Sequence, residues 1–267
     1  MTEHKEPGTR AVRQAVTVEA PADAVWRALT DAEELRRWFP VDARVEPGPG
    51  GTVWLSWGPG VEGTSRIEVW EPERRLRLVE EWPGAEGKLV RFVVDYHLEA
   101  RGGSTVLRLV HSGFGESSDW DDQYHSTEDG WRYFLFNLKH YLERHAGVPR
   151  VLIWERRRLS ASRDEVWRAL NGGDGLAQKD GEIRLPAGDA PHQGTVVMAQ
   201  PSRHLTALLP SLDDAVLFVE LESGKGDWHC GTYLSTYGLA PDRLARLRTD
   251  FQAFLDRILT PFQAPPG

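Results

Sequence analysis

Apolar side chains recur at helical spacing at the end of each half of this chain. In the first half the stripe covers residues 131–142, at steps of three and four residues. That spacing is typical of one face of an amphipathic helix, which is expected to start near Ser126 or Thr127 and to end before Gly147. A second stripe of the same kind closes the chain. Its members are Leu244, Leu247, Phe251, Phe254, Leu255 and Ile258.

A five-residue sequence occurs twice: Val-Trp-Arg-Ala-Leu fills residues 25–29 and again residues 166–170. Each copy follows a strand-like run and precedes one of the two long helices. A match in sequence, in element type and in element order indicates an internal duplication. The sequence therefore predicts two homologous domains, over residues 11–147 and 150–262.

Between the repeat and the long helix, the first half alternates apolar and polar residues in short runs that glycine and proline interrupt. Each run predicts one strand of an antiparallel meander, with a hairpin turn at Gly102-Gly103. The strands are expected at residues 13–19, 52–57, 64–70, 76–82, 89–99 and 105–112, and two helices at 21–29 and 32–38. The predicted fold class is α+β, with each domain a curved antiparallel sheet wrapped around a long C-terminal helix. Such an interior is not filled completely, so we expect an apolar cavity of the kind that binds small ligands.

Tryptophan is frequent, with 11 in the chain, and most lie in the first half. Strand alternation places a set of aromatic residues on the sheet face that the long helix covers. For any single ring, core packing is the simpler interpretation. For the set, the hypothesis is a flat-walled ligand cavity lined by Trp57, Trp82, Phe92, Tyr96, His111, Trp120, Trp131 and Leu135.

Two polar residues are candidates for catalysis. His111 alternates with leucines, so it is expected to point inward, although a buried histidine more often satisfies a hydrogen bond than catalyses. Glu80 also lies among apolar neighbours, where desolvation would raise the pKa of its carboxyl and suit it to acid or base chemistry. Arg108 and Asp95 are expected to face the other side of the sheet.

The acidic segment 116–127 has no counterpart in the second half and connects the strand of His111 to the long helix. It carries Trp120 and Tyr124 among several aspartates. Two interpretations stay open: a lid at the cavity mouth, or a solvated acidic loop.

The charge and composition of the chain argue against several classes of function. The net charge of −8 repels phosphate backbones and argues against nucleic-acid binding. No apolar run is long enough to span a membrane, and residues 1–10 are polar, so we expect a cytoplasmic protein. The single cysteine, Cys230, excludes an internal disulfide and is expected to be a small buried residue.

Neither a metal site nor a cofactor site is expected. His125, His140 and His145 lack the spacing and the carboxylate partner of a ligand set, and no phosphate-binding loop or nucleophile motif is present. The basic run 156–158 is expected to form a solvated or inter-domain face.

Four short motifs in the first half carry a resemblance to a known family. They are Trp-Arg-Ala-Leu-Thr-Asp at residues 26–31, Leu-Arg-Arg-Trp-Phe at 35–39, His-Ser-Gly-Phe at 111–114 and Gly-Trp at 130–131. Together they resemble the helix-grip superfamily, the START or Bet v1-like (SRPBCC) fold, and within it the AHSA1-like branch. The resemblance covers residues 11–147. The second half is similar in trimmed form: a loop at 171–175 replaces the Leu-x-x-Trp-Phe helix.

The resemblance implies a function as well as a fold. Helix-grip proteins of this kind, tandem ones included, occur in polyketide and enediyne antibiotic pathways as aromatase/cyclases, carriers or self-resistance proteins. The first hypothesis is therefore binding of a hydrophobic small molecule, such as a polyketide, a polyene or an aromatic natural product. The alternative is a cyclase or aromatase that works without metal or redox cofactor, with His111 and Glu80 as candidate groups. An Hsp90-activator-like co-chaperone or stress-response interaction module ranks last.

Overall fold

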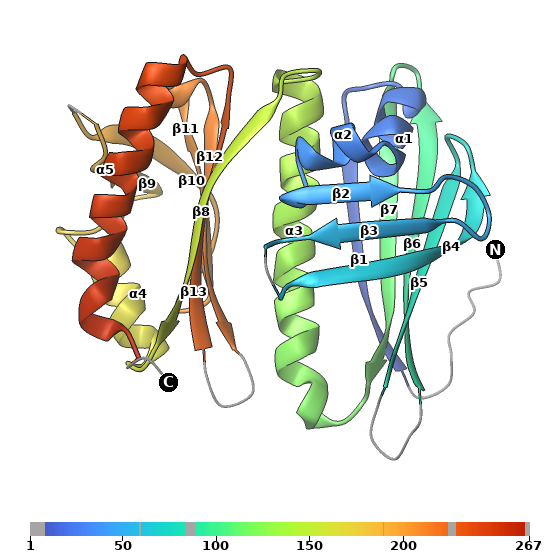
Figure 1. Ribbon diagram of the computed structural model, residues 1–267, viewed down its shortest axis with the longest axis horizontal. Helices are drawn as coiled ribbons and strands as arrows, with labels where there is room; N and C mark the ends of the chain where they lie inside the picture. The colour runs from blue at the N-terminus through green and yellow to red at the C-terminus, as the bar shows by residue number, and fades with distance from the viewer. Residues whose placement is uncertain (1–8, 59, 84–88, 189, 224–227, 265–267) are drawn as a thin grey trace. The chain divides into compact units, whose positions relative to one another are not determined.

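The computed structural model describes residues 9–58, 60–83, 89–188, 190–223 and 228–264. The chain divides into two compact units, Met1–Gly147 and Val148–Gly267. Figure 1 shows that each unit contains one antiparallel sheet and one long helix, so the predicted α+β class is confirmed. Independent folding of domains over residues 11–147 and 150–262 stays a prediction.

The first unit is built on a seven-stranded sheet in the order β1-β7-β6-β5-β4-β3-β2, in which all neighbours are antiparallel. The meander from β3 to β7 matches the prediction, and β1 closes the sheet against β7. The strands are β1 (Thr9–Val18), β2 (Asp42–Val45), β3 (Thr52–Ser56), β4 (Glu62–Glu71), β5 (Arg75–Pro83), β6 (Leu89–Arg101) and β7 (Ser104–Gly115). The sequence analysis missed the four-residue strand β2. Gly102 and Gly103 both have positive φ, as the β6–β7 hairpin requires.

Two short helices, α1 (Ala22–Thr30) and α2 (Ala32–Arg36), follow β1. The Asp31 side chain accepts hydrogen bonds from the backbone N–H groups of Glu33 and Glu34, and so caps α2. The Trp38 indole donates to the carbonyl of Ala28 at 2.7 Å, which ties the end of α2 to α1.

The long helix of the first unit, α3 (Asp121–Arg144), starts earlier than its apolar stripe indicates. The expected cap residues Ser126 and Thr127 lie inside it. The carboxylates of its first turn favour a helix N-terminus, and Asp121 also pairs with Arg10 at 2.6 Å. Much of segment 116–127 is therefore helix rather than loop, preceded by the short 3₁₀ turn η2 (Ser118–Trp120).

The second unit repeats this plan with six antiparallel strands in the order β8-β13-β12-β11-β10-β9. After α4 the chain makes turns where the first unit has α2, as expected for a trimmed copy. Its elements are β8 (Arg150–Leu159), α4 (Arg163–Asn171), β9 (Glu182–Leu185), β10 (His192–Gln200), β11 (His204–Leu209), η3 (Pro210–Leu212), β12 (Ala215–Ser223), β13 (Trp228–Tyr237), α5 (Pro241–Leu259) and η4 (Thr260–Phe262).

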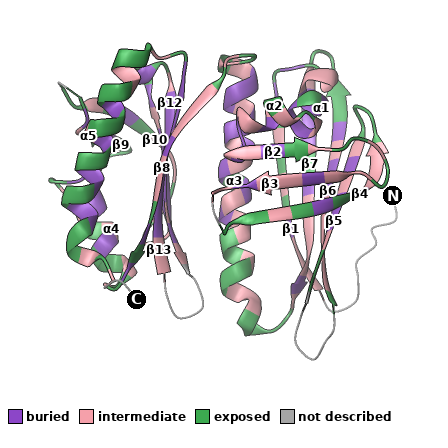
Figure 2. Cartoon of the chain, in the orientation of Figure 1, coloured by how far each residue is buried: buried purple, intermediate pink, exposed green. Residues whose placement is uncertain are grey.

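A continuous apolar core fills the space between α5 and the second sheet. The buried positions of α5, coloured purple in Figure 2, include Phe251 and Phe254. Cys230 is fully buried in this core, as predicted. Arg157 corrects the expectation of a solvated basic run, because it is buried and ion-paired with Glu155 at 2.6 Å and with Asp256 at 2.5 Å.

Candidate functional site

The centre of the candidate site in the first unit is a hydrogen bond between α3 and β7. The indole N–H of Trp131 donates to Nδ1 of His111 at 3.0 Å. This bond assigns the neutral tautomer of His111, because Nδ1 must accept and the ring proton therefore sits on Nε2. Among the residues that the structure describes, Nε2 makes no hydrogen bond.

A glycine bulge aims His111 inward. The pairing of β1 with β7 shifts register between Arg10 and Ala11, opposite Gly113. Gly113 has φ of +115°, and a Cβ there would lie 2.3 Å from the carbonyl oxygen of Arg91, so only glycine fits. The bulge resets the alternation of β7, and both His111 and Phe114 turn to the same side, with ring centroids 4.9 Å apart.

Rings from β6, from α3 and from the residues that follow α2 and β3 gather around Trp131. Its centroid lies 5.5 Å from that of Phe39, 6.0 Å from that of Tyr96 and 6.2 Å from that of Phe134. Trp57 lies 5.3 Å from Phe39. We call these six side chains the aromatic cluster: Phe39, Trp57, Tyr96, His111, Trp131 and Phe134.

Phe92 extends this wall along β6. Its ring lies 5.9 Å from His111 and 6.0 Å from Trp120. Trp120 covers the end of β7, where a Cβ on Gly115 would approach the indole nitrogen to 2.4 Å. Trp120 is therefore packed against the sheet, and the absence of a side chain at Gly115 makes that contact possible.

Burial differs along the inward face of this sheet. Leu76, Leu107 and Leu109 have no exposed surface, whereas Trp57, Phe92 and His111 are only half-buried although they face inward. Solvent therefore reaches these three side chains and does not reach the leucines. A closed hydrophobic core does not leave such surface on its aromatic residues.

The polar groups of the cluster are held in their neutral forms. Burial lowers the pKa of His111 to about 4, so the imidazole is uncharged near pH 7. Burial also raises the pKa of the Tyr96 hydroxyl. The indole nitrogen of Trp57 is buried and has no hydrogen-bond partner among the described residues, which is uncommon for a buried donor.

Glu80 and Trp82 lie apart from this cluster. Glu80 accepts a hydrogen bond from the Ser65 hydroxyl at 2.6 Å and another from the Trp82 indole at 3.0 Å. Strand β6 runs between Glu80 and His111, and no hydrogen bond joins these two candidates. Trp82 lies at the end of β5 and is 52% exposed, so its inclusion in the cavity wall is wrong. Strand alternation predicts which face of the sheet a side chain lies on, but it does not predict whether that part of the face is covered.

The remaining members of the expected set lie on the inward side, and Leu135 is buried on α3. Phe39 and Phe134 were missing from that set, although their two rings contact each other at a centroid distance of 4.5 Å. Phe134 follows Trp131 at helical spacing, so its position was available from the stripe. Phe39 lies between the end of α2 and Pro40, outside any helix or strand, where no periodicity predicts its direction.

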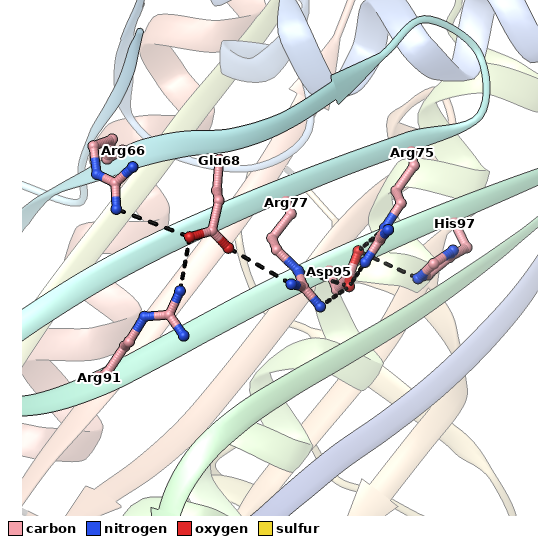
Figure 3. A network of polar contacts seen from close by, with 7 residues as sticks. All are labelled: Arg66, Glu68, Arg75, Arg77, Arg91, Asp95 and His97. Atoms are coloured by element: carbon pink, nitrogen blue, oxygen red, sulfur yellow. Dashed lines mark hydrogen bonds and ion pairs between the residues drawn. The ribbon is translucent and has the colours of Figure 1, made fainter. Parts of the chain in front are cut away.

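The outer face of the same sheet carries a network of ion pairs (Figure 3). Arg75 donates two hydrogen bonds to Asp95, at 3.0 and 2.8 Å, and Arg77 adds a third at 3.0 Å. Burial raises the pKa of Asp95, but the hydrogen bond from Arg75 and the charges of Arg77, His97 and Arg75 outweigh it, so the pKa is lowered. The network clamps β5 to β6 on the side away from the aromatic cluster, which indicates a structural role.

Two further observations concern metals and membranes. Within the described ranges, no group of three or more His, Cys, Asp or Glu side chains is placed to hold a metal ion. No helix in that part of the chain is long and apolar enough to cross a membrane.

Comparison with known families gives one match, to the activator of Hsp90 ATPase homolog 1-like (AHSA1) family over residues 19–143. This range spans α1 to α3, and with them the aromatic cluster. Residues 19–143 of the first unit are therefore similar to the AHSA1-like family. No curated protein matches the chain.

Several solved structures are similar in fold. MLL2253 from Mesorhizobium loti is 25% identical over 51% of this chain and 98% of its own, with a TM-score of 0.46. DynU16, from the dynemicin biosynthetic locus, is 22% identical over 91% of this chain and 95% of its own, with a TM-score of 0.43. BexL, a di-domain ARO/CYC from the BE-7585A pathway, is 15% identical over 94% of each chain, with a TM-score of 0.46.

Proposed function

We propose that the AHSA1-like unit binds a flat, conjugated, oxygen-bearing small molecule against its aromatic cluster. The observation that carries this proposal is the solvent-reached surface on rings that face inward, combined with the unpartnered indole N–H of Trp57. A polyketide, a polyene or an aromatic natural product fits both features. The family resemblance points to the same class of ligand.

The ring geometry supports a flat ligand. Trp57, Phe92 and Trp131 each meet a neighbouring ring edge-to-face, at interplanar angles of 83°, 77° and 82°. Aromatic pairs in edge-to-face or offset-stacked arrangements gain about 0.5–1.5 kcal/mol beyond the burial of their area. A saturated chain would gain binding free energy from burial alone, whereas a conjugated ligand would gain it from burial and from contact with the rings.

The two donors support an oxygen-bearing ligand. A buried donor without a partner costs about 1–3 kcal/mol, and a ligand carbonyl beside Trp57 would remove that cost. The Nε2 proton of His111 is a second donor on the same wall. Because both donors are uncharged, they suit a ketone or quinone oxygen better than a carboxylate.

The test is isothermal titration calorimetry of the full chain with three uncharged probes: an anthraquinone, a linear all-trans polyene alcohol and a saturated alcohol of the same length. We expect the two conjugated probes to bind in the micromolar range and the saturated alcohol to bind more weakly. If none of the three probes binds, the proposal is wrong.

A pair of variants locates the site. Trp57→Phe keeps a ring and removes the N–H, so anthraquinone affinity should fall by about tenfold, the value of one hydrogen bond. Trp54→Phe is the matched control, because Trp54 lies on β3 just before Trp57 and stacks with Arg44 on the outer face. Equal effects of the two variants would contradict the assignment.

Cyclase or aromatase activity is the second candidate, favoured by one observation. Trp131 fixes the ring of His111 so that Nε2–H points away from α3, which is how an enzyme holds a donor for a substrate carbonyl. With a pKa of about 4, His111 is a poor proton acceptor at neutral pH. In such a reaction it would stabilise negative charge on an enolising carbonyl rather than remove a proton.

A further inference from the structure

The second unit contains a pocket of about 470 Å³ that the proposed function does not use. It lies between the first turns of α5, the connection from β9 to β10, and η3. Its volume is in the range of small-molecule sites. The lining residues that carry the argument are His192, Ser211, Leu212, Arg243, Arg246 and Leu247; Asp189, in the same connection, lies outside the described residues.

One wall of the pocket is a fixed polar surface. The guanidinium of Arg243 donates a hydrogen bond to the carbonyl oxygen of Ser211. Nδ1 of His192 is 2.8 Å from the hydroxyl oxygen of the same serine. These two contacts hold the arginine and the imidazole on either side of η3, so both are oriented before any ligand arrives.

Two arginines make this wall positively charged, and their position does not stabilise the helix that carries them. Arg243 and Arg246 lie in the first two turns of α5, where the helix dipole disfavours cations. Their acidic neighbours compensate only in part: Asp213 is 3.8 Å from Arg243, and Asp242 is 3.4 Å from Arg246 in a largely exposed pair. A bound anion would offset this unfavourable arrangement.

The imidazole adds a neutral polar group to this wall. Burial and the charge of Arg243 lower the pKa of His192, so the ring is uncharged near pH 7. The ring is held by the Ser211 hydroxyl at Nδ1 and by a hydrogen bond to the backbone of Ala187, so it shapes the wall without adding to the positive charge. The charge of the wall thus comes from the two arginines.

The floor of the pocket is apolar. Leu212 and Leu247 are buried beneath it, with 1% and 3% of their surface exposed. A cationic wall above an apolar floor matches a molecule with a compact hydrophobic body and one acidic group. An arginine fork fits the two oxygens of a carboxylate in particular.

From this geometry we propose that the pocket is a binding site for an organic carboxylate whose apolar body rests on Leu212 and Leu247 and whose acidic group meets Arg243 and Arg246. The site is confined to the second unit. It is independent of the aromatic cluster and does not rest on the function proposed for that cluster.

The test uses the full chain, with cyclohexanecarboxylate as the probe and cyclohexanecarboxamide as its uncharged counterpart; both are saturated, so neither is a ligand expected for the aromatic cluster. Calorimetry should show binding of the carboxylate that weakens as salt is added, and at least tenfold weaker binding of the amide. Equal affinity for acid and amide would overturn the proposal. Tighter binding of inorganic phosphate than of cyclohexanecarboxylate would also overturn it, because the apolar floor would then contribute nothing.

Variants separate this pocket from other sites. Arg243→Gln and Arg246→Gln should each weaken cyclohexanecarboxylate binding about tenfold. Arg246→Gln is the safer of the two for folding, because the Arg246 side chain is 64% exposed. Arg248→Gln, on the same helix and exposed outside the pocket, is the matched control and should leave the affinity unchanged. A parallel loss in Arg248→Gln would contradict the assignment.

Discussion

Trp131 and His111 are joined by a 3.0 Å hydrogen bond between the closing helix and the last strand of the first sheet. Among the described residues this is the one side-chain hydrogen bond of each, and each side chain also packs against Phe39 or Phe92. The contact therefore combines two roles. It fixes the helix on the sheet, and it fixes the protonation state of the histidine that borders the proposed ligand.

The first prediction separates the two roles of Trp131. Trp131→Ala should lower the free energy of unfolding by about 3–5 kcal/mol, because a large buried ring is lost. Trp131→Phe keeps most of the packing and loses the N–H, so we expect a loss of about 1–2 kcal/mol. Urea denaturation measures both values. Arg132→Ala, exposed on the next position of α3, should change stability by less than about 0.5 kcal/mol.

The second prediction concerns acid sensitivity. The native pKa of His111 is about 4, below the value of about 6.5 in an unfolded chain. Between these two pH values the unfolded state binds more protons, so stability must fall as the pH is lowered from 6.5 to 4. The loss from this one group is at most about 3 kcal/mol and ends below pH 4.

The control for this prediction is His111→Gln, which does not titrate in that range and retains an acceptor for Trp131. Subtracting the unfolding free energies of the variant from those of the natural protein at each pH isolates the contribution of the histidine. A difference that is constant from pH 4 to pH 6.5 would contradict a neutral buried imidazole.

Much of the fold could be predicted from periodicity alone. The stripe at residues 131–142 and its counterpart on α5 gave the long helices, and the duplicated five-residue sequence located α1 and α4. The start of α3 was placed too late because residues 121–123 are polar, and an apolar stripe cannot mark a helical turn that has no apolar residue. Tyr124 was the available signal, since it stands seven residues before Trp131 and packs on Phe114 at 5.6 Å.

The candidate site was less predictable, because it depends on contacts between elements far apart in sequence. Strand alternation correctly turned His111 inward and Asp95 outward. It could not show that Trp82 extends past the covered part of the sheet, or that Phe39 returns from α2 to meet Phe134. It also could not show that Glu80 takes its hydrogen bonds from Ser65 and Trp82.

The third prediction tests the ion pairs on the outer face. Asp95→Asn should destabilise the protein by about 3 kcal/mol, because Arg75 and Arg77 then lose their shared carboxylate at a largely buried position. Since the native pKa of Asp95 is lowered, its contribution is fully present above the ordinary carboxyl pKa and is lost as the pH falls through the native value. Glu99→Gln, an exposed position on the same strand and face, should leave stability nearly unchanged.

The last prediction concerns the packing of Trp120 on Gly115. A methyl group at Gly115 would come within 2.4 Å of the indole nitrogen, so Gly115→Ala should force the ring off Phe92 and destabilise the protein by about 1–3 kcal/mol. Trp120→Ala removes the ring that causes this clash. The double variant should therefore be about as stable as Trp120→Ala alone. A double-mutant cycle should then give a large interaction energy between positions 115 and 120.

Gly130→Ala is the matched control for that cycle. A Cβ at Gly130 would meet only a ring carbon of Phe134, at 3.8 Å, and alanine is about 1 kcal/mol better than glycine inside a helix. We therefore expect Gly130→Ala to raise the melting temperature and to show no coupling to Trp120→Ala. If Gly115→Ala instead adds its full cost in the absence of Trp120, the cost does not come from the indole, and the packing of Trp120 on Gly115 is contradicted.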